Sequence, residues 1–242
     1  MFIILKKELR SFFSSATGYI VIALFLLVTS LFLWVFPGQY NILESGYAQT
    51  DGLFELAPWL YLFLIPAITM RMFAEEKRTG TIELLYTRPL KKISIVLGKY
   101  FAGWILAALS LLPTIIYYFS IYYLADPVGN VDTGAFFGSF IGLFFLASVY
   151  VAIGIFASAI TDNQIISFIA AVVMTVFLLY GFDLLASLFS SGKWASFSLS
   201  LGINSHYESM SRGVIDSRDV VYFLSTTTIF IFITERVISH KS

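Results

Sequence analysis

Few residue types in this sequence could do chemistry, and they are too scattered to form a catalytic site. The chain has no cysteine, and its two histidines, His206 and His240, lie far apart. Neither an HExxH motif nor a G-x-x-x-x-G-K-[ST] phosphate loop occurs, so the sequence predicts no zinc site and no ATP site in this chain. We expect no catalytic residue, no metal ion and no cofactor bound by the chain itself.

The most informative segment is the charged stretch from Arg71 to Leu90. Its Thr79–Thr81 part combines a helix breaker, Gly80, with a residue type that caps helices. A short amphipathic helix is predicted to follow, with Glu83 in its first turn, Ile82, Leu85 and Tyr86 on its apolar face, and Pro89 at its end. Such a helix could dock into a groove on a cytoplasmic partner, or the stretch could be a solvated loop.

The elements that position this segment are predicted to be membrane-spanning helices. Of the 242 residues, 58% are hydrophobic and only 12% are charged, against about 25% charged in soluble domains. The net charge of zero argues against a nucleic-acid partner. Runs of about 20 apolar residues predict an all-α, polytopic membrane protein with one transmembrane domain over residues 1–242, whose six spans lie at about 17–36, 53–73, 100–125, 134–161, 163–185 and 220–238.

The distribution of lysine and arginine predicts the orientation of these spans. With the N-terminus in the cytoplasm, only Lys193, Arg212 and Arg218 of the 15 basic residues would lie outside. Basic residues favour the cytoplasmic side of a membrane, so both termini are predicted to be cytoplasmic.

The first residues predict an amphipathic helix that lies in the cytoplasmic interface. Apolar and basic side chains recur at helical spacing, with Phe2, Leu5, Leu9 and Phe12 on one side and Lys6, Lys7 and Arg10 on the other. The basic side chains would face anionic lipid headgroups.

Small residues recur every four positions in the fourth span, as Gly134, Gly138 and Gly142. Such a row lets two helices approach closely, either within the chain or between two subunits. Acids are almost absent from the spans. Glu55 and Asp183 fall near span ends, which argues against an ion-coupled transporter.

The segment from Ser187 to Asp219 is predicted to be the longest outer loop. Within it, Ser205-x-x-Glu208 has the pattern of a capping box, and Asp216 to Asp219 is a second possible helix start. His206 is predicted to be a surface or capping residue and not a metal ligand.

The charged stretch resembles the cytoplasmic loop of ABC-2-type transporter permeases. The resemblance rests on Glu75-Glu76-x-x-x-Gly80-Thr81-x-Glu83-Leu84-Leu85-x-x-x-Pro89, followed by Gly98-Lys99. It extends to Lys7-Glu8-Leu9-x-x-x-Phe13, Gly18-Tyr19 and Trp34 near the start of the chain. The late segment, with Ser205-His206-Tyr207-Glu208, Arg212-Gly213-Val214-Ile215-Asp216 and Tyr222-Phe223, is similar to the permease subunit of the gliding-motility ABC exporter.

This resemblance implies that the short loop helix is a coupling helix, which docks on a separate ATPase subunit and passes its motion to the spans. Glu75, Glu76, Gly80, Thr81, Glu83, Leu84 and Pro89 match the motif, and Ile82 and Leu85 supply the apolar face. ATP and Mg²⁺ would be bound by the ATPase. The resemblance also implies a second permease chain, identical or not, an auxiliary membrane-anchored subunit, and a place among the lipids of the bacterial inner membrane.

The expected function is therefore that of a permease subunit in an ATP-driven exporter of the gliding-motility type, and not that of an enzyme. The alternative is a membrane scaffold that anchors a motility or secretion complex without transporting anything. An intramembrane enzyme is disfavoured because the spans lack nucleophile–base pairs. The apolar, aromatic spans fit lipid-like, polymer or peptide cargo equally well.

Overall fold

The structure is a computed structural model that describes residues 1–83, 91–189 and 192–240. These residues form helices joined by turns and loops, without a strand among them. Six helices or joined helices are long and apolar enough to cross a membrane: 18–35, 51–78, 92–124, 133–160, 164–188 and 217–239. The prediction of an all-α protein with six spans is confirmed.

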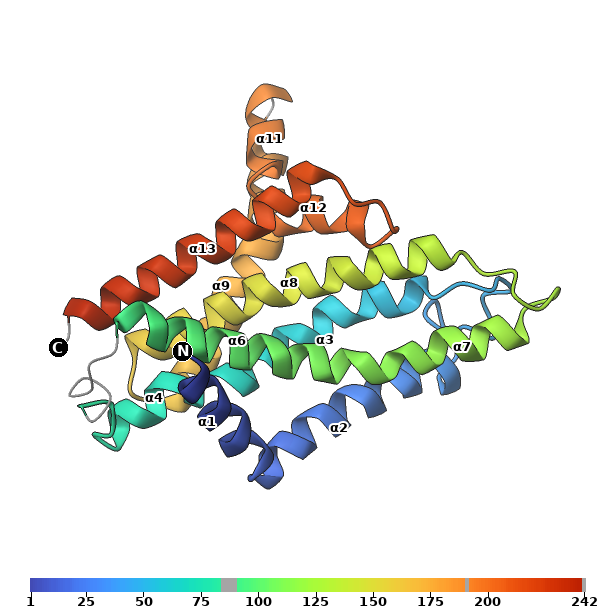
Figure 1. Cartoon of the computed structure of the whole chain (residues 1–242). Coiled ribbons are helices and arrows are strands. Elements are labelled where there is room, and N and C mark those ends of the chain that lie inside the picture. The colour runs from blue at the N-terminus through green and yellow to red at the C-terminus, as the bar shows by residue number, and fades with distance from the viewer. Residues whose placement is uncertain (84–90, 190–191, 241–242) are drawn as a thin grey trace.

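The helices follow one another along the chain in an up-and-down bundle (Figure 1). Their bounds are α1 Phe2–Phe13, α2 Ala16–Ser30, η1 Leu31–Val35, α3 Asp51–Thr69, α4 Arg71–Arg78, α6 Lys92–Leu111, η2 Leu112–Thr114, α7 Ile115–Leu124, α8 Thr133–Ile160, α9 Gln164–Val176, η3 Phe177–Gly181, α10 Phe182–Leu188, α11 Gly192–Leu199, α12 Ile203–Met210 and α13 Ser217–His240.

At one end of the bundle the helices extend beyond the spans that hydropathy placed at 53–73 and 100–125. There α3 and α4 run almost without a break from Asp51 to Arg78, and α6 begins at Lys92. Met70, between α3 and α4, keeps right-handed helical angles. Hydropathy ends a span at its first charges, whereas a helix can continue through charges that find partners.

Helix α8 is the centre of the fold, with α3, α6 and α13 packed around it (Figure 1). Most of its side chains are buried, whereas most side chains of the spans built on α2, on α9 and on α13 are half-buried or exposed. Those outer helices are apolar on the surface that a membrane would cover. Exposed apolar side chains on these helices are therefore what a protein embedded in a bilayer requires.

The small residues of α8 receive the end of α12 and the turn that follows it. A Cβ on Gly138 would collide with the backbone of Gly213, and one on Gly142 would lie 2.7 Å from Met210 Cβ. Gly134 is open, since a Cβ there would meet only Asp132 Oδ1, at 3.5 Å. Two of the three glycines thus allow the turn after α12 to lie close against α8.

Two helix starts were predicted in the segment before α13, at Ser205 and at Asp216, and the structure shows only the second. Helix α12 begins at Ile203 after Gly202, and Ser205 lies within it, donating to the carbonyl of Gly202 at 3.0 Å. The predicted capping box at Ser205 is therefore wrong, because the backbone turns into the helix earlier, at the glycine. Asp216 does start α13, since its Oδ1 accepts from the backbone N–H of Arg218 at 2.8 Å.

Candidate functional site

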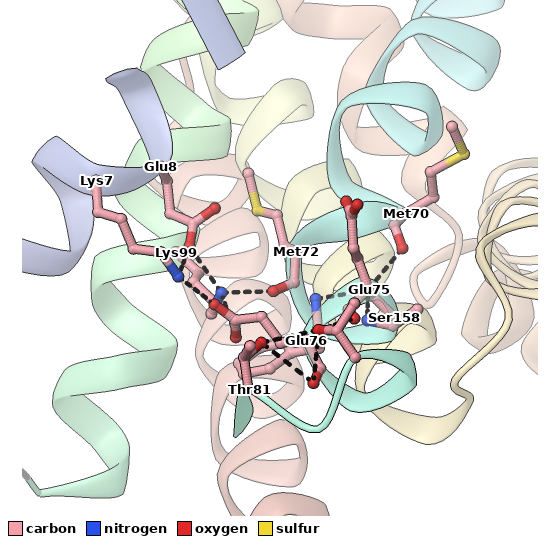
Figure 2. Close-up of polar contacts among 12 residues, drawn as sticks. Lys7, Glu8, Met70, Met72, Glu75, Glu76, Thr81, Lys99 and Ser158 are labelled. Atoms are coloured by element: carbon pink, nitrogen blue, oxygen red, sulfur yellow. Dashed lines mark hydrogen bonds and ion pairs between the residues drawn. The ribbon is translucent and has the colours of Figure 1, made fainter. Parts of the chain in front are cut away.

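The end of the bundle where α1, α4, α6 and the last turn of α8 meet is called the charged end. A cluster of four charges lies there (Figure 2), formed by Lys7, Glu8, Glu76 and Lys99. Its centre is Lys99 on α6, whose side chain is fully buried. The Lys99 ammonium donates to Glu8 Oε1 at 2.8 Å and to the carbonyl of Met72, and it lies 2.9 Å from Glu76 Oε2. The last contact has ion-pair distance but is too bent for a hydrogen bond.

Two hydrogen-bond acceptors and a further carboxylate at ion-pair distance give Lys99 the environment that a buried cation needs. The Phe73 ring adds a fourth contact, with its centroid 4.8 Å from Lys99 Nζ. Because Glu8 belongs to α1 and Glu76 to α4, the single ammonium group of α6 joins three helices.

Lys7 completes the cluster from the solvent side. Its ammonium donates to Glu76 and lies 3.7 Å from Glu8 Oε1. Burial lowers the pKa of Lys7, but its hydrogen bond with Glu76 and the attraction of Glu76 and Glu8 outweigh burial and raise it. The stability that Lys7 contributes is therefore present below its ordinary pKa of about 10.4 and is lost as the pH rises through the raised value.

Two neighbours on α6 explain how α1 comes to lie against the bundle. A Cβ on Gly98 would lie 2.9 Å from Ile4 Cβ and 3.0 Å from the Met1 carbonyl oxygen, so only glycine admits this approach. Ile4 is buried there, whereas Phe2, predicted to be on the apolar face, is exposed. Gly98 thus allows the contact, and Lys99 beside it fixes the contact electrostatically.

Helix α4 is also held by α8. Ser158 Oγ accepts from the backbone N–H groups of Phe73 and Ala74, both at 3.0 Å, and donates to the Met70 carbonyl at 2.9 Å. Lys77 donates to the carbonyl of Ala159 at the end of α8. The first N–H groups of a helix lack partners within it, and here a serine of a distant helix supplies one.

Helix α4 ends in a turn that leads the chain out of the bundle. Gly80 has a φ of +70°, a left-handed backbone that glycine adopts without strain. Thr81 is exposed and hydrogen-bonds with Thr79 Oγ1 at 2.9 Å. Ile82 packs partly against the core, whereas Glu83 is exposed.

The predicted coupling residues therefore lie in three settings. Glu76 is buried in the charge cluster, so the alternative of a solvated loop does not hold at this residue. Glu75 points away from the cluster (Figure 2), and Gly80, Thr81 and Glu83 are exposed at the turn. Leu84, Leu85 and Pro89, with Tyr86, lie outside the described residues.

Sequence reasoning missed Lys99 and Glu8 as site residues, because it counted Lys99 among the flanking cations. One signal could have identified Lys99: it is the only charge between Ile93 and Ala125. A lone charge inside an apolar helix must find partners, and two acids on neighbouring helices are such partners.

A second polar cluster lies at the far end of the bundle, which comprises α12, the first turn of α13 and the first turns of α8. His206 Nδ1 lies 2.7 Å from Asp219 Oδ1 and His206 Nε2 lies 3.0 Å from the Ser200 carbonyl. Ser209 donates to Asp219 Oδ2 at 2.6 Å, and the His206 ring stacks on Tyr222 with centroids 3.9 Å apart. His206 thus fastens α12 to α13. In the described part of the chain no His, Cys, Asp and Glu group of three or more is arranged to hold a metal ion.

Six apolar helices and a charged end that gathers four distant segments define a multi-pass membrane protein. The chain belongs to the ABC-2 family of transporters, since the family model described as ABC-2 family transporter protein matches residues 2–238. The matched range covers the N-terminal helix, the charge cluster and all six spans. No curated protein matches the chain in sequence. Membership makes this chain the membrane component of an ABC transporter, a component that is not itself catalytic.

Proposed function

We propose that this chain is the permease subunit of an ATP-driven exporter and that the turn after α4 docks on a separate ATPase subunit. The observation that carries the proposal is the Lys99 cluster, which ties α4 to α1 and α6. Helix α4 leads directly into the exposed turn at Gly80. A push on that turn would therefore move α4, α1 and α6 together.

Within this proposal the motif residues divide their roles. Gly80, Thr81 and Glu83 are exposed and would meet the ATPase, together with Ile82, Leu84, Leu85 and Pro89. Glu76 would act from inside, by holding α4 to Lys99. ATP and Mg²⁺ would be bound by the partner, because this sequence has no phosphate loop.

The coupling role is tested with Gly80→Pro and Glu83→Ala in the full chain. Proline requires a φ near −65°, which the left-handed turn at Gly80 does not allow. We expect less ATPase subunit to copurify with each variant, and slower ATP hydrolysis by the complex in lipid nanodiscs. Normal copurification and normal hydrolysis in both variants would refute the coupling role.

The loop between α2 and α3 offers matched controls. Gly46 has a φ of +71°, with nothing near its Cβ position, so Gly46→Pro imposes the same backbone conflict elsewhere. Glu44→Ala removes an exposed acid from the same loop. Both controls should leave copurification and hydrolysis unchanged.

The orientation proposed is the one with both termini in the cytoplasm of the bacterial inner membrane. Its support is the basic bias of the charged end, which holds α1, α4 and the start of α6. Because the chain has no cysteine, single cysteines at Arg78 and at Gln39 can be labelled with an impermeant maleimide. Labelling of Gln39→Cys and not of Arg78→Cys in intact spheroplasts is expected, and the reverse pattern would overturn the orientation.

The gliding-motility type is a finer proposal, supported by the late segment around His206 and Gly213. It adds an auxiliary membrane-anchored subunit and a second permease chain to the complex. A scaffold without transport activity is the alternative. The two are separated by ATP-dependent transport into inverted vesicles that contain the complex, which a scaffold would not show.

A further inference from the structure

Two cavities adjoin along α3 and α4, and one carries charged groups whereas the other does not. One, of about 190 Å³, lies at the charged end between α1 and α4, and its lining mixes charged and hydroxyl side chains with the apolar Phe12, Ala67, Ile68, Met72 and Leu106. The other, of about 360 Å³, lies between α2 and α3 and is lined by apolar side chains alone. Ala67 lines both cavities, so they meet at this small residue.

The α3–α4 wall changes character in a fixed order along one helix face. Leu60, Leu64, Ala67, Arg71 and Glu75 follow one another at spacings of three or four residues, which places them on one stripe. The stripe is apolar to Leu64, small at Ala67, cationic at Arg71 and anionic at Glu75. A helix rises 1.5 Å per residue, so Ala67, Arg71 and Glu75 are separated by steps of roughly 6 Å.

The opposite wall changes character at the same level. Helix α2 lines the apolar cavity with Val21, Leu24, Phe25 and Val28. Helix α1 lines the polar cavity with Lys7 and Ser11, and Ser15 lies at the corner between the two helices. Both walls are thus apolar toward the middle of the span and polar toward its end, as at the boundary between hydrocarbon and headgroups.

Arg71 and Glu75 are the charges of this cavity that have no ion-pair partner among the described residues. Lys7, Glu8 and Glu76 in the same lining already belong to the Lys99 cluster. Across residues 1–83, 91–189 and 192–240, no carboxylate lies within ion-pair distance of Arg71 and no cation within that distance of Glu75, although both are half-buried. A half-buried arginine is an expected binding site for phosphate, which its planar fork can contact through two hydrogen bonds.

We propose that this pair of cavities binds one zwitterionic phospholipid, phosphatidylethanolamine, from the leaflet at the charged end. An acyl chain lies between α2 and α3, the glycerol passes Ala67, the phosphate meets Arg71 and the ammonium meets Glu75. The order of groups along the helix stripe is the order of groups in this lipid. An anionic lipid fits less well, because it would bring its headgroup to Glu75 without a cation to neutralise that acid.

The site does not depend on the proposed coupling to an ATPase. A lipid held here would contact α1, α2, α3 and α4 at once, and would fill the space beside the Lys99 cluster. Lipid binding at this site is a property of the permease chain alone, so this proposal and the proposed coupling to an ATPase can fail separately.

The test is a titration of the purified, delipidated full chain with phosphatidylethanolamine or phosphatidylglycerol of the same acyl chains, followed by native mass spectrometry. Wild type should bind the ethanolamine lipid more tightly. Arg71→Gln should weaken both lipids roughly tenfold, as expected for a lost charge-assisted pair of hydrogen bonds. Glu75→Gln should weaken only the ethanolamine lipid and abolish the preference.

The acyl half of the site has its own variants. Ala67→Phe places a ring where the two cavities meet and should weaken both lipids, whereas Ala67→Ser leaves the passage open and should bind as wild type does. Ala23→Phe is the matched control, because Ala23 is exposed on α2 and lines neither cavity. Arg10→Gln is the matched control for Arg71, since Arg10 is exposed on α1 outside the cavity.

Arg71→Lys guards against loss of folding, because it keeps the charge and should keep part of the binding. The proposal is overturned if wild type binds both lipids equally, or if Arg71→Gln and Ala67→Phe bind as their controls do. It is also overturned if Glu75→Gln keeps the preference for the ethanolamine lipid.

Discussion

The charged end and the far end of this bundle are both held by polar clusters, but the clusters span very different lengths of chain. Lys99 and Glu8 are 91 residues apart in sequence, and Lys99 is fully buried between helices. At the far end, His206 and Asp219 are only 13 residues apart; Asp219 is about as buried as Glu8, and His206 keeps 17% of its side chain exposed. The charged end is thus a long-range junction of three helices, whereas the far end is a local clasp between α12 and α13.

This difference matters because buried and open polar contacts have unequal energies. Removing one partner of a buried pair leaves the others without compensation, whereas an open contact is replaced by water. The charged end should therefore move as one body, as the proposed coupling to an ATPase would require, and the far end should be able to rearrange more locally.

The largest effect is expected from Lys99→Met. The variant leaves Glu8 and Glu76 close together and nearly buried, so we expect the free energy of unfolding to fall by about 3–5 kcal/mol. Unfolding in mixed micelles measures it. Adding Glu76→Gln should recover part of the loss, because one uncompensated charge is then removed. An equal loss from His206→Phe would contradict the distinction between the two ends.

The fold itself could largely be predicted from sequence, and the reason is physical. Apolar runs of spanning length leave a chain little choice but helices, so all six spans were found. The helices continue past two predicted span ends, to Arg78 and back to Lys92, because hydropathy treats charge as a stop. Whether a charge is tolerated depends on partners from other helices, such as Glu8 for Lys99.

The candidate site could be predicted only in part, for the same reason. The turn at Gly80 follows from local residue types, and its left-handed backbone agrees with the predicted breaker. The inward direction of Glu76 and the role of Ser158 depend on helices far away in sequence. One chain without its relatives gives periodicity and turn chemistry, but it does not indicate which distant side chains meet.

A smaller effect is expected from Ser158→Ala, which tests whether the hydrogen bonds between α8 and α4 also stabilise the charged end. The variant leaves the buried backbone N–H groups of Phe73 and Ala74 without their acceptor, so a loss of about 1–3 kcal/mol is expected. Ser225→Ala on the exposed side of α13 is the control. Faster hydrogen exchange confined to α4 would locate the effect, and protection equal to wild type would remove Ser158 from the junction.

At the far end, His206→Phe should cost less. Phenylalanine can keep the stacking on Tyr222 but loses the contacts to Asp219 and to the Ser200 carbonyl. Asp219 is nearly buried but keeps the hydrogen bond from Ser209, and the position of His206 is partly exposed, so a loss of about 0.5–1.5 kcal/mol is expected. Hydrogen exchange should increase in α12 and in the first turn of α13 without any change in α4. A change that spread to α4 would show that the two ends are coupled.

The smallest effect is expected from Arg212→Ala, which tests the open end of the comparison. Arg212 and Glu208 form an ion pair at 3.1 Å across one helical turn, with both side chains more than half exposed. Such pairs contribute less than about 0.5 kcal/mol, since water solvates each partner almost as well as the other does. The unfolding midpoint of the variant should stay within error of the wild-type midpoint, and the difference between them should be the same at low and at high salt. A loss as large as that of Ser158→Ala would mean that another surface, such as a second subunit, covers this pair in the assembled transporter.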